Sequence, residues 1–281
     1  MTSSRQLFSV LGFVIFLSFC LKPTVTVDFI PTDPLFTSQW YISNKDHPSA
    51  DINAPQAWNR HKASGRGVTV AVIDNYFDIL HDDLLNATVQ SLSRNFVDDS
   101  ANVSPSKSVA NAISSKGTSL AGMVLARTNE VAAIGLAYNA FFAPLTVAHT
   151  IKAEQIAAAL VFEKDRIQIY CNTWMSEDGF GYKTQIPDVI SNALEEGVTT
   201  GRAGKGNIYV FPAGSSYTKT LGVPESTNFD GYANNPYTIT VGALTRTGYP
   251  GTGAYHNPGL SIMGVVPASS SLTDTVVRKV C

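Results

Sequence analysis

The sequence lacks several features that would assign it to a specialised class of protein. Only three cysteines occur in 281 residues, charged residues make up 15% of them, and the formal net charge is −2. So few cysteines exclude a small disulfide-stapled scaffold, and there is no internal repeat or low-complexity tract. Lysines and arginines are nowhere clustered, so the sequence favours neither a nucleic-acid nor an anionic-lipid partner. What it does have, 44% hydrophobic residues, is enough for one large domain with a deep core.

The longest hydrophobic run of the sequence lies near the N-terminus. Arg5 precedes a mostly apolar run at 7–21, which is shorter than the roughly 20 residues that a transmembrane helix needs. A charged start and a short apolar run are typical of a secretory signal peptide. We predict this peptide at residues 1–27, with an uncleaved anchor as the alternative, and no later segment is apolar enough to span a membrane. The mature chain is therefore expected in the secretory pathway, either secreted or in the ER or Golgi lumen.

Two glycosylation sequons fit that location. Asn86 stands in Asn-Ala-Thr and Asn102 in Asn-Val-Ser, where Pro105 makes Asn102 the poorer acceptor. Outside the N-terminal run, only Cys171 and Cys281 remain. Cys171 lies in an apolar, strand-like run, which favours a buried free thiol over a bridge between these two cysteines.

Strand-like and helix-like segments alternate along the rest of the chain. The strands that we predict from apolar, β-branched runs are 67–74, 166–174, 206–215 and 236–244. The helices that we predict are 114–126, 152–165 and 186–200. Helices between such strands indicate an α/β fold with a mostly parallel sheet covered on both faces. Functional groups gather at the carboxyl ends of parallel strands, so Asp74, Asp178 and Ser215 are expected at one edge of the sheet.

Several long segments, in order along the chain, carry a specific resemblance. They include GVTVAVID at 67–74, KGTSLAGMV at 116–124, IYCNTW at 169–174 and FDGYANNPYTITVGA at 229–243. In these segments the chain resembles the kexin/furin-type proprotein convertases among the subtilisin-like serine proteases. The resemblance covers nearly all of 28–281, and it implies a three-layer α/β/α subtilisin-like peptidase domain over that range.

The resemblance implies a Ser-His-Asp mechanism, in which an aspartate orients the histidine that deprotonates a serine. Asp74 matches that aspartate, although a single aspartate at a strand end is otherwise a turn or capping residue. Lys116 stands where the family motif has histidine. Lysine has a reference pKa of about 10.4 against about 6.5 for histidine, so it starts protonated and cannot accept the serine proton. We predict an Asp74–Lys116 ion pair that closes the site, while noting that Ser-Lys dyads exist elsewhere.

Two further members of the catalytic set are replaced or missing. Ser215 stands for the asparagine that supplies an oxyanion donor, and losing such a donor typically costs about 10²–10³ in rate. The family nucleophile lies in a Gly-Thr-Ser-Ala stretch, and the sequence ends at Cys281 in the segment that resembles the one just upstream. The sequence therefore predicts a domain truncated at the C-terminus that lacks the nucleophile. Gly-Thr-Ser at 117–119 is not a substitute, because its neighbours match the histidine helix.

By the same resemblance, part of the binding machinery is kept. Asp178 and Asp230 match the two acids that line the primary pocket for a basic residue. Asn75 replaces the acid that follows the catalytic aspartate, which weakens selection of a second basic residue. The expected ligand is a basic peptide, or an active convertase, rather than a dibasic substrate.

Asp33 and Asp83 match family calcium ligands, and calcium prefers such hard oxygen donors. The alternative for Asp33 is a turn cap before Pro34. The resemblance thus implies a calcium ion near these two carboxylates, with the loop at 128–135 supplying the other ligands. It also implies a second calcium site around Asp178, where Glu225 and Asn257 stand in for acids.

Three interpretations remain open at this point. The chain is a catalytically inactive relative that binds basic peptides or an active convertase, or an active endopeptidase whose nucleophile lies outside this sequence, or a gene remnant without a selected function. The retained carboxylates favour the first interpretation over the third, whereas the missing C-terminal helix, which normally packs centrally in this fold, favours the third, so the sequence does not separate the two. The loss of the base and of the oxyanion amide argues against the second.

Overall fold

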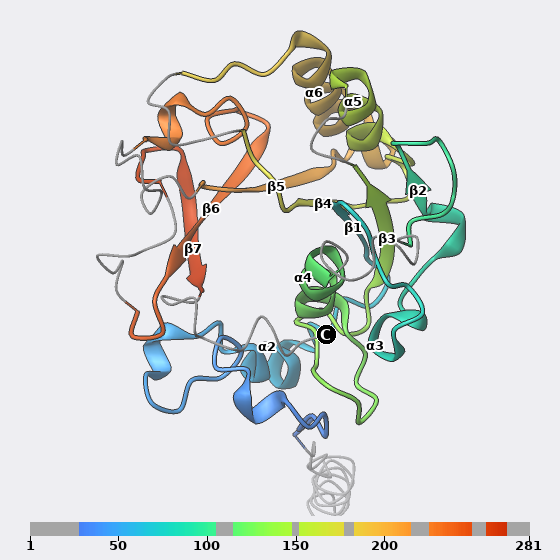
Figure 1. Ribbon diagram of the computed structural model, residues 1–281. Helices are drawn as coiled ribbons and strands as arrows, with labels where there is room; N and C mark the ends of the chain where they lie inside the picture. The colour runs from blue at the N-terminus through green and yellow to red at the C-terminus, as the bar shows by residue number, and fades with distance from the viewer. Residues whose placement is uncertain are drawn as a thin grey trace, which may run out of the picture. The chain divides into compact units, whose positions relative to one another are not determined.

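A seven-stranded sheet forms the centre of the computed structural model, which describes residues 28–104, 115–147, 152–176, 183–214, 225–248 and 257–268 (Figure 1). The strands are β1 Thr69–Asp74, β2 Arg94–Asn95, β3 Phe141–Thr146, β4 Ile169–Asn172, β5 Ile208–Pro212, β6 Thr238–Leu244 and β7 Ile262–Pro267. Their order is β2-β3-β1-β4-β5-β6-β7, and every neighbouring pair is parallel. The parallel sheet and four of its strands, β1, β4, β5 and β6, confirm the sequence prediction.

Helices cover the sheet from two sides. The helices are α2 Ala54–His61, α3 Asp82–Leu85, α4 Ser115–Leu125, α5 Ala153–Val161 and α6 Asp188–Gly204. The three predicted helices are confirmed as α4, α5 and α6, although α5 ends four residues earlier than expected. Among the described residues, no helix is long and apolar enough to cross a membrane. The predicted signal peptide at 1–27 lies outside the described residues.

Strand β1 is buried on both faces of the sheet, which explains why its sequence is a continuous apolar run. Ala71 and Ile73 belong to a core shared with α5 and α6, whereas Val70 and Val72 belong to a second core shared with α4. All four side chains are at most 4% exposed. A strand buried on both faces has no polar side, so its sequence does not alternate.

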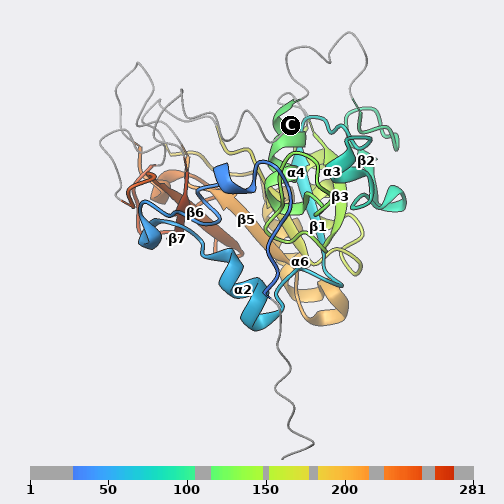
Figure 2. The same cartoon turned by 90° about the horizontal axis from the view of Figure 1, so that it is seen from below.

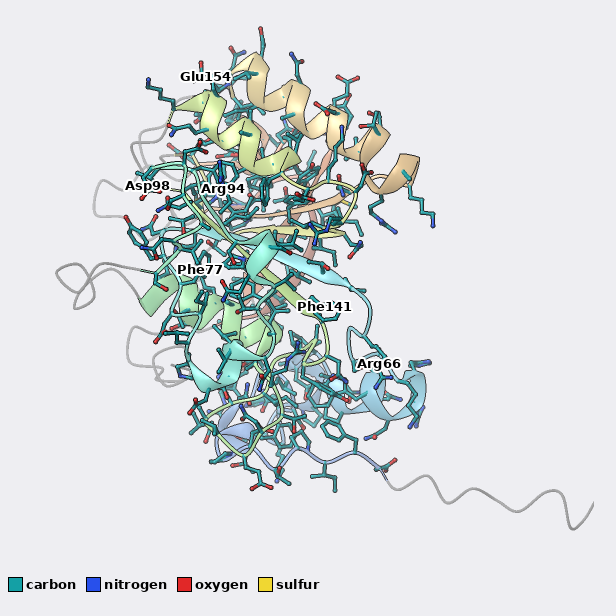
Figure 3. The ribbon with its side chains drawn as sticks, turned by 90° about the vertical axis from the view of Figure 1, so that its right-hand side faces the viewer. Arg66, Phe77, Arg94, Asp98, Phe141 and Glu154 are labelled. Atoms are coloured by element: carbon teal, nitrogen blue, oxygen red, sulfur yellow. The ribbon has the colours of Figure 1, made fainter. Side chains whose placement is uncertain are left out.

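The parallel strands give the sheet two chemically different edges. In Figure 3, Phe77, which follows β1, and Arg94, which lies in β2, are toward one edge of the sheet. Phe141, the first residue of β3, and Arg66, which precedes β1, are toward the other edge. We call these the carboxyl edge and the amino edge. Asp74, the last residue of β1, lies at the carboxyl edge, where the sequence predicted the functional groups.

Strand β7 ends the sheet on one side. Its side chains are mostly exposed, with Met263 at 71% and Val265 at 45%. The pairing of β7 with β6 shifts register between Thr240 and Val241. Within the part of the chain that the structure describes, β7 has one neighbouring strand, and it has a glycine in its middle. It therefore lacks the buried apolar run that marks β1, which explains why the sequence did not reveal it.

Candidate functional site

Asp74 is the centre of the site at the carboxyl edge. Its side chain is only 2% exposed. One carboxylate oxygen, Oδ1, accepts a hydrogen bond of 2.7 Å from the Asn75 backbone N–H. The other oxygen, Oδ2, accepts from the Thr173 hydroxyl and lies 3.2 Å from Lys116 Nζ. The carboxylate is therefore saturated by neighbours from β1, β4 and α4, and its charge is balanced inside the protein.

Helix α4 brings Lys116 to this carboxylate. A Cβ atom on Gly117 would lie 2.4 Å from the Tyr76 carbonyl oxygen and 3.3 Å from the Asp74 Cβ. Only glycine therefore lets the start of α4 approach the end of β1 so closely. Lys116 then donates a 3.0 Å hydrogen bond to the Thr173 carbonyl, while 51% of its side chain stays exposed. The ion pair predicted from the sequence is present.

Thr173 is a site residue that the sequence reading missed. Its hydroxyl contacts Asp74 Oδ2 and lies 3.0 Å from the Ile73 carbonyl, and its own carbonyl accepts from Lys116. Thr173 follows β4, and β4 pairs with β1 through Ile73 and Asn172. Thr173 and Asp74 are about a hundred residues apart in the chain. The contact could have been predicted only by knowing that β4 pairs with β1.

Cys171 lies in β4 opposite Val72 of β1 and is free. Burial, together with the negative charge of Asp74, raises the pKa of its thiol to about 11. A thiol with such a pKa is almost entirely protonated at neutral pH, so Cys171 is not a reactive nucleophile. Cys281, with which the sequence predicted no disulfide bridge, lies outside the described residues.

A second group of carboxylates lies apart from the first, on the segments around Asp33 and α3. Asp33 is 3% exposed and Asp83 is 1% exposed. Asp33 Oδ1 accepts from the Asn129 N–H at 3.2 Å, and Asp83 Oδ2 accepts from the Ala133 N–H at 3.5 Å. Among the described residues, no donor reaches Asp33 Oδ2 or Asp83 Oδ1. Buried carboxylate oxygens without donors are costly unless a cation occupies the space between them.

The electrostatics of Asp83 agree with that geometry. Burial raises the pKa of its carboxyl, and the charge of Asp33 raises it further. Hydrogen bonds from Asn129 and Ala133 and the charge of His81 act in the opposite direction and do not cancel the burial. No set of three or more histidine, cysteine, aspartate or glutamate side chains gathers anywhere in the described ranges. A cation here would therefore need Asn129 and backbone carbonyl groups besides the two aspartates.

Asp230 lines a cleft of about 320 Å³ between 183–191 and 228–234. Its Oδ1 accepts backbone hydrogen bonds from Tyr232 at 2.8 Å and Ala233 at 2.7 Å, which fix the carboxylate at the cleft wall. Asp188 and Lys183 also line the cleft, so it carries two carboxylates and one ammonium group. The cleft has the size and charge to hold one cationic side chain.

Some predicted site residues cannot be placed against this geometry. Asp178, Ser215 and Cys281 lie outside the described residues. The structure therefore brings together Asp74 and Lys116 in one place and Asp33 and Asp83 in another, and it places Asp230 in a third.

The two sequon asparagines are both exposed. Asn86 follows α3 as its C-terminal cap, and Asn102 accepts a 3.2 Å hydrogen bond from the Ser104 N–H through its side-chain oxygen. Exposure is what a glycosylation acceptor requires. Modification of either residue stays a prediction.

Comparison with known proteins was made on sequence and on structure. The model of the subtilase family matches residues 65–276. Among curated proteins, the chain is 34% identical over 219 residues to "Protease KEX1" of Kluyveromyces lactis, which covers 77% of this chain and 28% of the relative. It is 33% identical over 214 residues to kexin of Saccharomyces cerevisiae, with coverages of 75% and 25%. Human neuroendocrine convertase 2 is 30% identical over 229 residues, with coverages of 79% and 35%.

Solved structures give the same fold at lower identity. The serine protease of Aeromonas sobria superimposes with a TM-score of 0.71 at 19% identity, covering 86% of this chain and 44% of the protease. A protease of Pseudoalteromonas arctica superimposes with a TM-score of 0.66 at 21% identity, with coverages of 86% and 74%. These neighbours confirm the predicted fold class. The chain spans only about a quarter to a third of the length of the curated relatives it matches.

Proposed function

Since the chain belongs to the subtilase family, on the branch of kexin and the neuroendocrine convertases, we propose that it is a catalytically inactive member that binds basic peptides in the secretory pathway. The location is argued from the N-terminal apolar run and the two sequons. The family role, which is proprotein processing at basic sites, would then be reduced to recognition without cleavage.

The observation that carries this proposal is the contact of Lys116 with Asp74. A subtilase needs a group at this position that accepts a proton from a serine and is oriented by the aspartate. An ammonium group has three donors and no lone pair, and that of Lys116 directs donors at Asp74 Oδ2 and the Thr173 carbonyl. Its donors are thus directed at protein oxygens, and the residue in the base position presents no acceptor to a serine hydroxyl.

Recognition of a basic peptide rests on Asp230. Its carboxylate is held by two backbone N–H groups, so the side chain is already ordered before a ligand arrives. A guanidinium group pairs well with such a fixed carboxylate because it donates two parallel hydrogen bonds. Asp178, by resemblance, would add a second carboxylate. The basic segment of an active convertase is an alternative ligand of the same chemistry.

Calcium is the cation that suits the second group of carboxylates. The donor set would be Asp33, Asp83, Asn129 and carbonyl oxygens of 129–133, all of which are hard oxygen ligands. The oxygens of Asp33 and Asp83 that lack donors fit this role. When bound, the ion would neutralise two buried carboxylates and hold the 129–133 loop in place. Chemistry at Asp74 does not pass through it.

The test uses the secreted full chain, an Arg-containing fluorogenic peptide and a fluorophosphonate probe for activated serines. We expect no hydrolysis and no covalent labelling, but saturable binding of the uncleaved peptide that Asp230→Asn weakens. The binding contribution of a charge-assisted pair suggests a loss of about 2–3 kcal/mol, roughly 30–150-fold in affinity. Asp46→Asn, an exposed acid outside the cleft, is the matched control.

Two results would contradict the proposal in different ways. Hydrolysis that the probe blocks would establish the active-protease alternative, and a rise in hydrolysis with Lys116→His/Ser215→Asn would show that these two residues had limited it. A chain that folds cooperatively but binds no basic peptide would remove the recognition role. A chain recovered only as aggregate would support the gene-remnant interpretation.

A further inference from the structure

Lysine and arginine residues that are far apart in the sequence lie at the amino edge of the sheet. Five lysine and arginine side chains lie on the segments that lead into β1 and β5, and we call them the basic edge: Arg60, Lys62, Arg66, Arg202 and Lys205. All except Arg202, which is half-buried, are exposed. Within the described ranges, none of the five has a carboxylate at ion-pair distance. In a chain whose net charge is −2, this is a local reversal of sign.

The first part of the basic edge is held in place by the turn before β1. Gly65 has a φ of +83°, and a Cβ there would lie 2.8 Å from the Ala137 Cβ and 2.9 Å from the Ala140 Cβ. The turn is thus pressed against the segment before β3, and the Asn139 N–H donates to the Ser64 carbonyl at 2.8 Å. Arg66 follows directly, and Figure 3 shows it at the amino edge.

The second part is held by the end of α6. The helix breaks at Arg202 and Ala203, which have φ of 56° and 54°. The Arg202 N–H donates to the Lys164 carbonyl at 3.0 Å, and the Ala203 N–H donates to Asp165 Oδ1 at 2.8 Å. These contacts fasten the loop that carries Lys205 to the loop before β4. Figure 2 shows α2 and α6 reaching the same lower edge of the view, and Figure 1 shows them on opposite sides of the sheet.

Gln168 joins the two parts. It exchanges hydrogen bonds with Thr69 at the start of β1, and its carbonyl accepts from Ile208 at the start of β5. Arg66 and Lys205 each lie three residues before these contacts. β1 and β5 are the two neighbours of β4, and neighbouring strands are about 4.8 Å apart. The segments that carry Arg66 and Lys205 therefore enter the sheet at the same edge, on either side of β4.

Negative charge at this edge is mostly cancelled. Glu196 pairs with Lys164, and Glu163 lies 3.4 Å from Arg166. Asp165 is the remaining exposed carboxylate of the loop before β4, and it faces the backbone of Ala203. The field of the basic edge is therefore positive.

Two apolar side chains accompany the basic edge. Phe141, the first residue of β3, is 46% exposed, and Ile208, the first residue of β5, is 37% exposed. Exposed apolar side chains next to cations are the combination that binds the surface of an anionic bilayer, where the cations meet headgroups and the apolar groups enter the interface. A sulfated polysaccharide would use the cations and gain little from the apolar side chains.

We propose that the amino edge, comprising the basic edge with Phe141 and Ile208, docks the protein on an anionic phospholipid membrane. The carboxyl edge, with Asp74 and Lys116, then faces away from the bilayer. This surface is separate from the peptide cleft, so it does not depend on the peptide recognition proposed above. It does require a membrane that presents anionic phospholipid to the compartment in which the chain lies.

The experiment measures cosedimentation of the full chain with phosphatidylserine-containing vesicles and with neutral phosphatidylcholine vesicles. We expect binding to the anionic vesicles that salt weakens. Arg66→Glu/Lys205→Glu should lower the partition coefficient by about tenfold or more, because each basic residue near an anionic surface contributes severalfold. The control Lys45→Glu/Lys152→Glu carries the same charge change away from the amino edge. Lys45 adjoins Asp46, which pairs with Arg246 beyond the end of β6. Lys152 directly precedes α5.

A second variant separates a membrane from other polyanions. Phe141→Ser should weaken vesicle binding severalfold and leave binding to heparin unchanged, because only a bilayer accepts the aromatic ring. Equal loss in the basic-edge and control variants, with unfolding temperatures unchanged, would overturn the proposal. Binding to heparin without binding to anionic vesicles would also overturn it, in favour of a polysaccharide.

Discussion

Asp74 and the pair Asp33/Asp83 are all buried aspartates, but the protein treats their charge in opposite ways. Asp74 meets an ammonium group that the chain itself supplies, together with the Thr173 hydroxyl and the Asn75 N–H. Asp33 and Asp83 each keep one oxygen that no described donor reaches, and the charge of Asp33 raises the pKa of Asp83. The comparison shows that burial alone does not mark a reactive site. The charge of Asp74 is compensated within the chain, whereas Asp33 and Asp83 each keep an oxygen without a described donor.

We expect the largest loss of stability from a substitution that separates α4 from β1 beside Asp74. Gly117→Ala places a Cβ 2.4 Å from the Tyr76 carbonyl, where backbone must move. Overpacking of this kind typically costs about 1–3 kcal/mol, and we expect the upper end because the obstacle is backbone. Chemical denaturation measures the loss. Gly264→Ala is the control, since no atom lies within 4 Å of the added Cβ; an equal loss in both variants would remove the role given to Gly117.

The second region should respond to calcium. Ligand bound only to the folded state stabilises it by about 2.7 kcal/mol at a concentration a hundred times Kd, so the unfolding temperature should rise with calcium. Asp83→Asn should abolish the rise, because it removes one of the two carboxylates. Asp82→Asn, an exposed neighbour, should keep it. A rise that survives Asp83→Asn would place the calcium elsewhere.

A smaller effect is expected from removal of the internal cation. Breaking a fully buried pair costs about 3–5 kcal/mol, but Lys116 is half exposed and Asp74 keeps two other donors. Lys116→Met should therefore cost about 1–2 kcal/mol. Lys45→Met, which removes an exposed cation, should change stability by less than about 0.5 kcal/mol. If both variants were equally stable, the ion pair would contribute nothing to the closed site.

The smallest effect concerns pH in the calcium-free chain. Burial raises the pKa of the Asp83 carboxyl above its ordinary value of 3.8. In the pH window between the ordinary pKa and the raised pKa, the folded chain binds more protons than the unfolded chain. Stability from this group is then greatest at low pH and falls as pH rises through the window. Asp83→Asn should flatten that dependence above the ordinary pKa of 3.8, as followed by denaturation at each pH. A wild-type curve that rises with pH to the same extent as that of the variant would contradict it.

The sequence predicted the elements that are buried on both faces and failed where strands are interrupted. Strand β3 contains Pro144, and proline normally argues against a central strand. It is tolerated because the ladder to β2 begins one residue later, at Leu145. Strand β7 has no apolar face to detect, since most of its side chains are exposed.

The site was predictable where one motif carried it and not where distant segments met. Lys116 was recognised from its neighbours, and the ion pair with Asp74 followed from charge. Thr173 was missed because its contact depends on β4 pairing with β1. The basic edge was missed for the same reason, since the segments that carry Arg66 and Lys205 come to one edge only because β1 and β5 both pair with β4.

Strand β7 has a consequence for handling the protein in solution. Within the described residues it has one neighbour, β6, and its sequence IMGVVP contains no charged side chain. An apolar strand with an open side is a template for strands of other chains, and natural proteins oppose such pairing with lysine, proline or a bulge. β7 has no lysine, but it ends at Pro267 and its pairing shifts register opposite Thr240 and Val241. Any self-association of concentrated samples through this strand should therefore use the short regular stretch between the shift and Pro267.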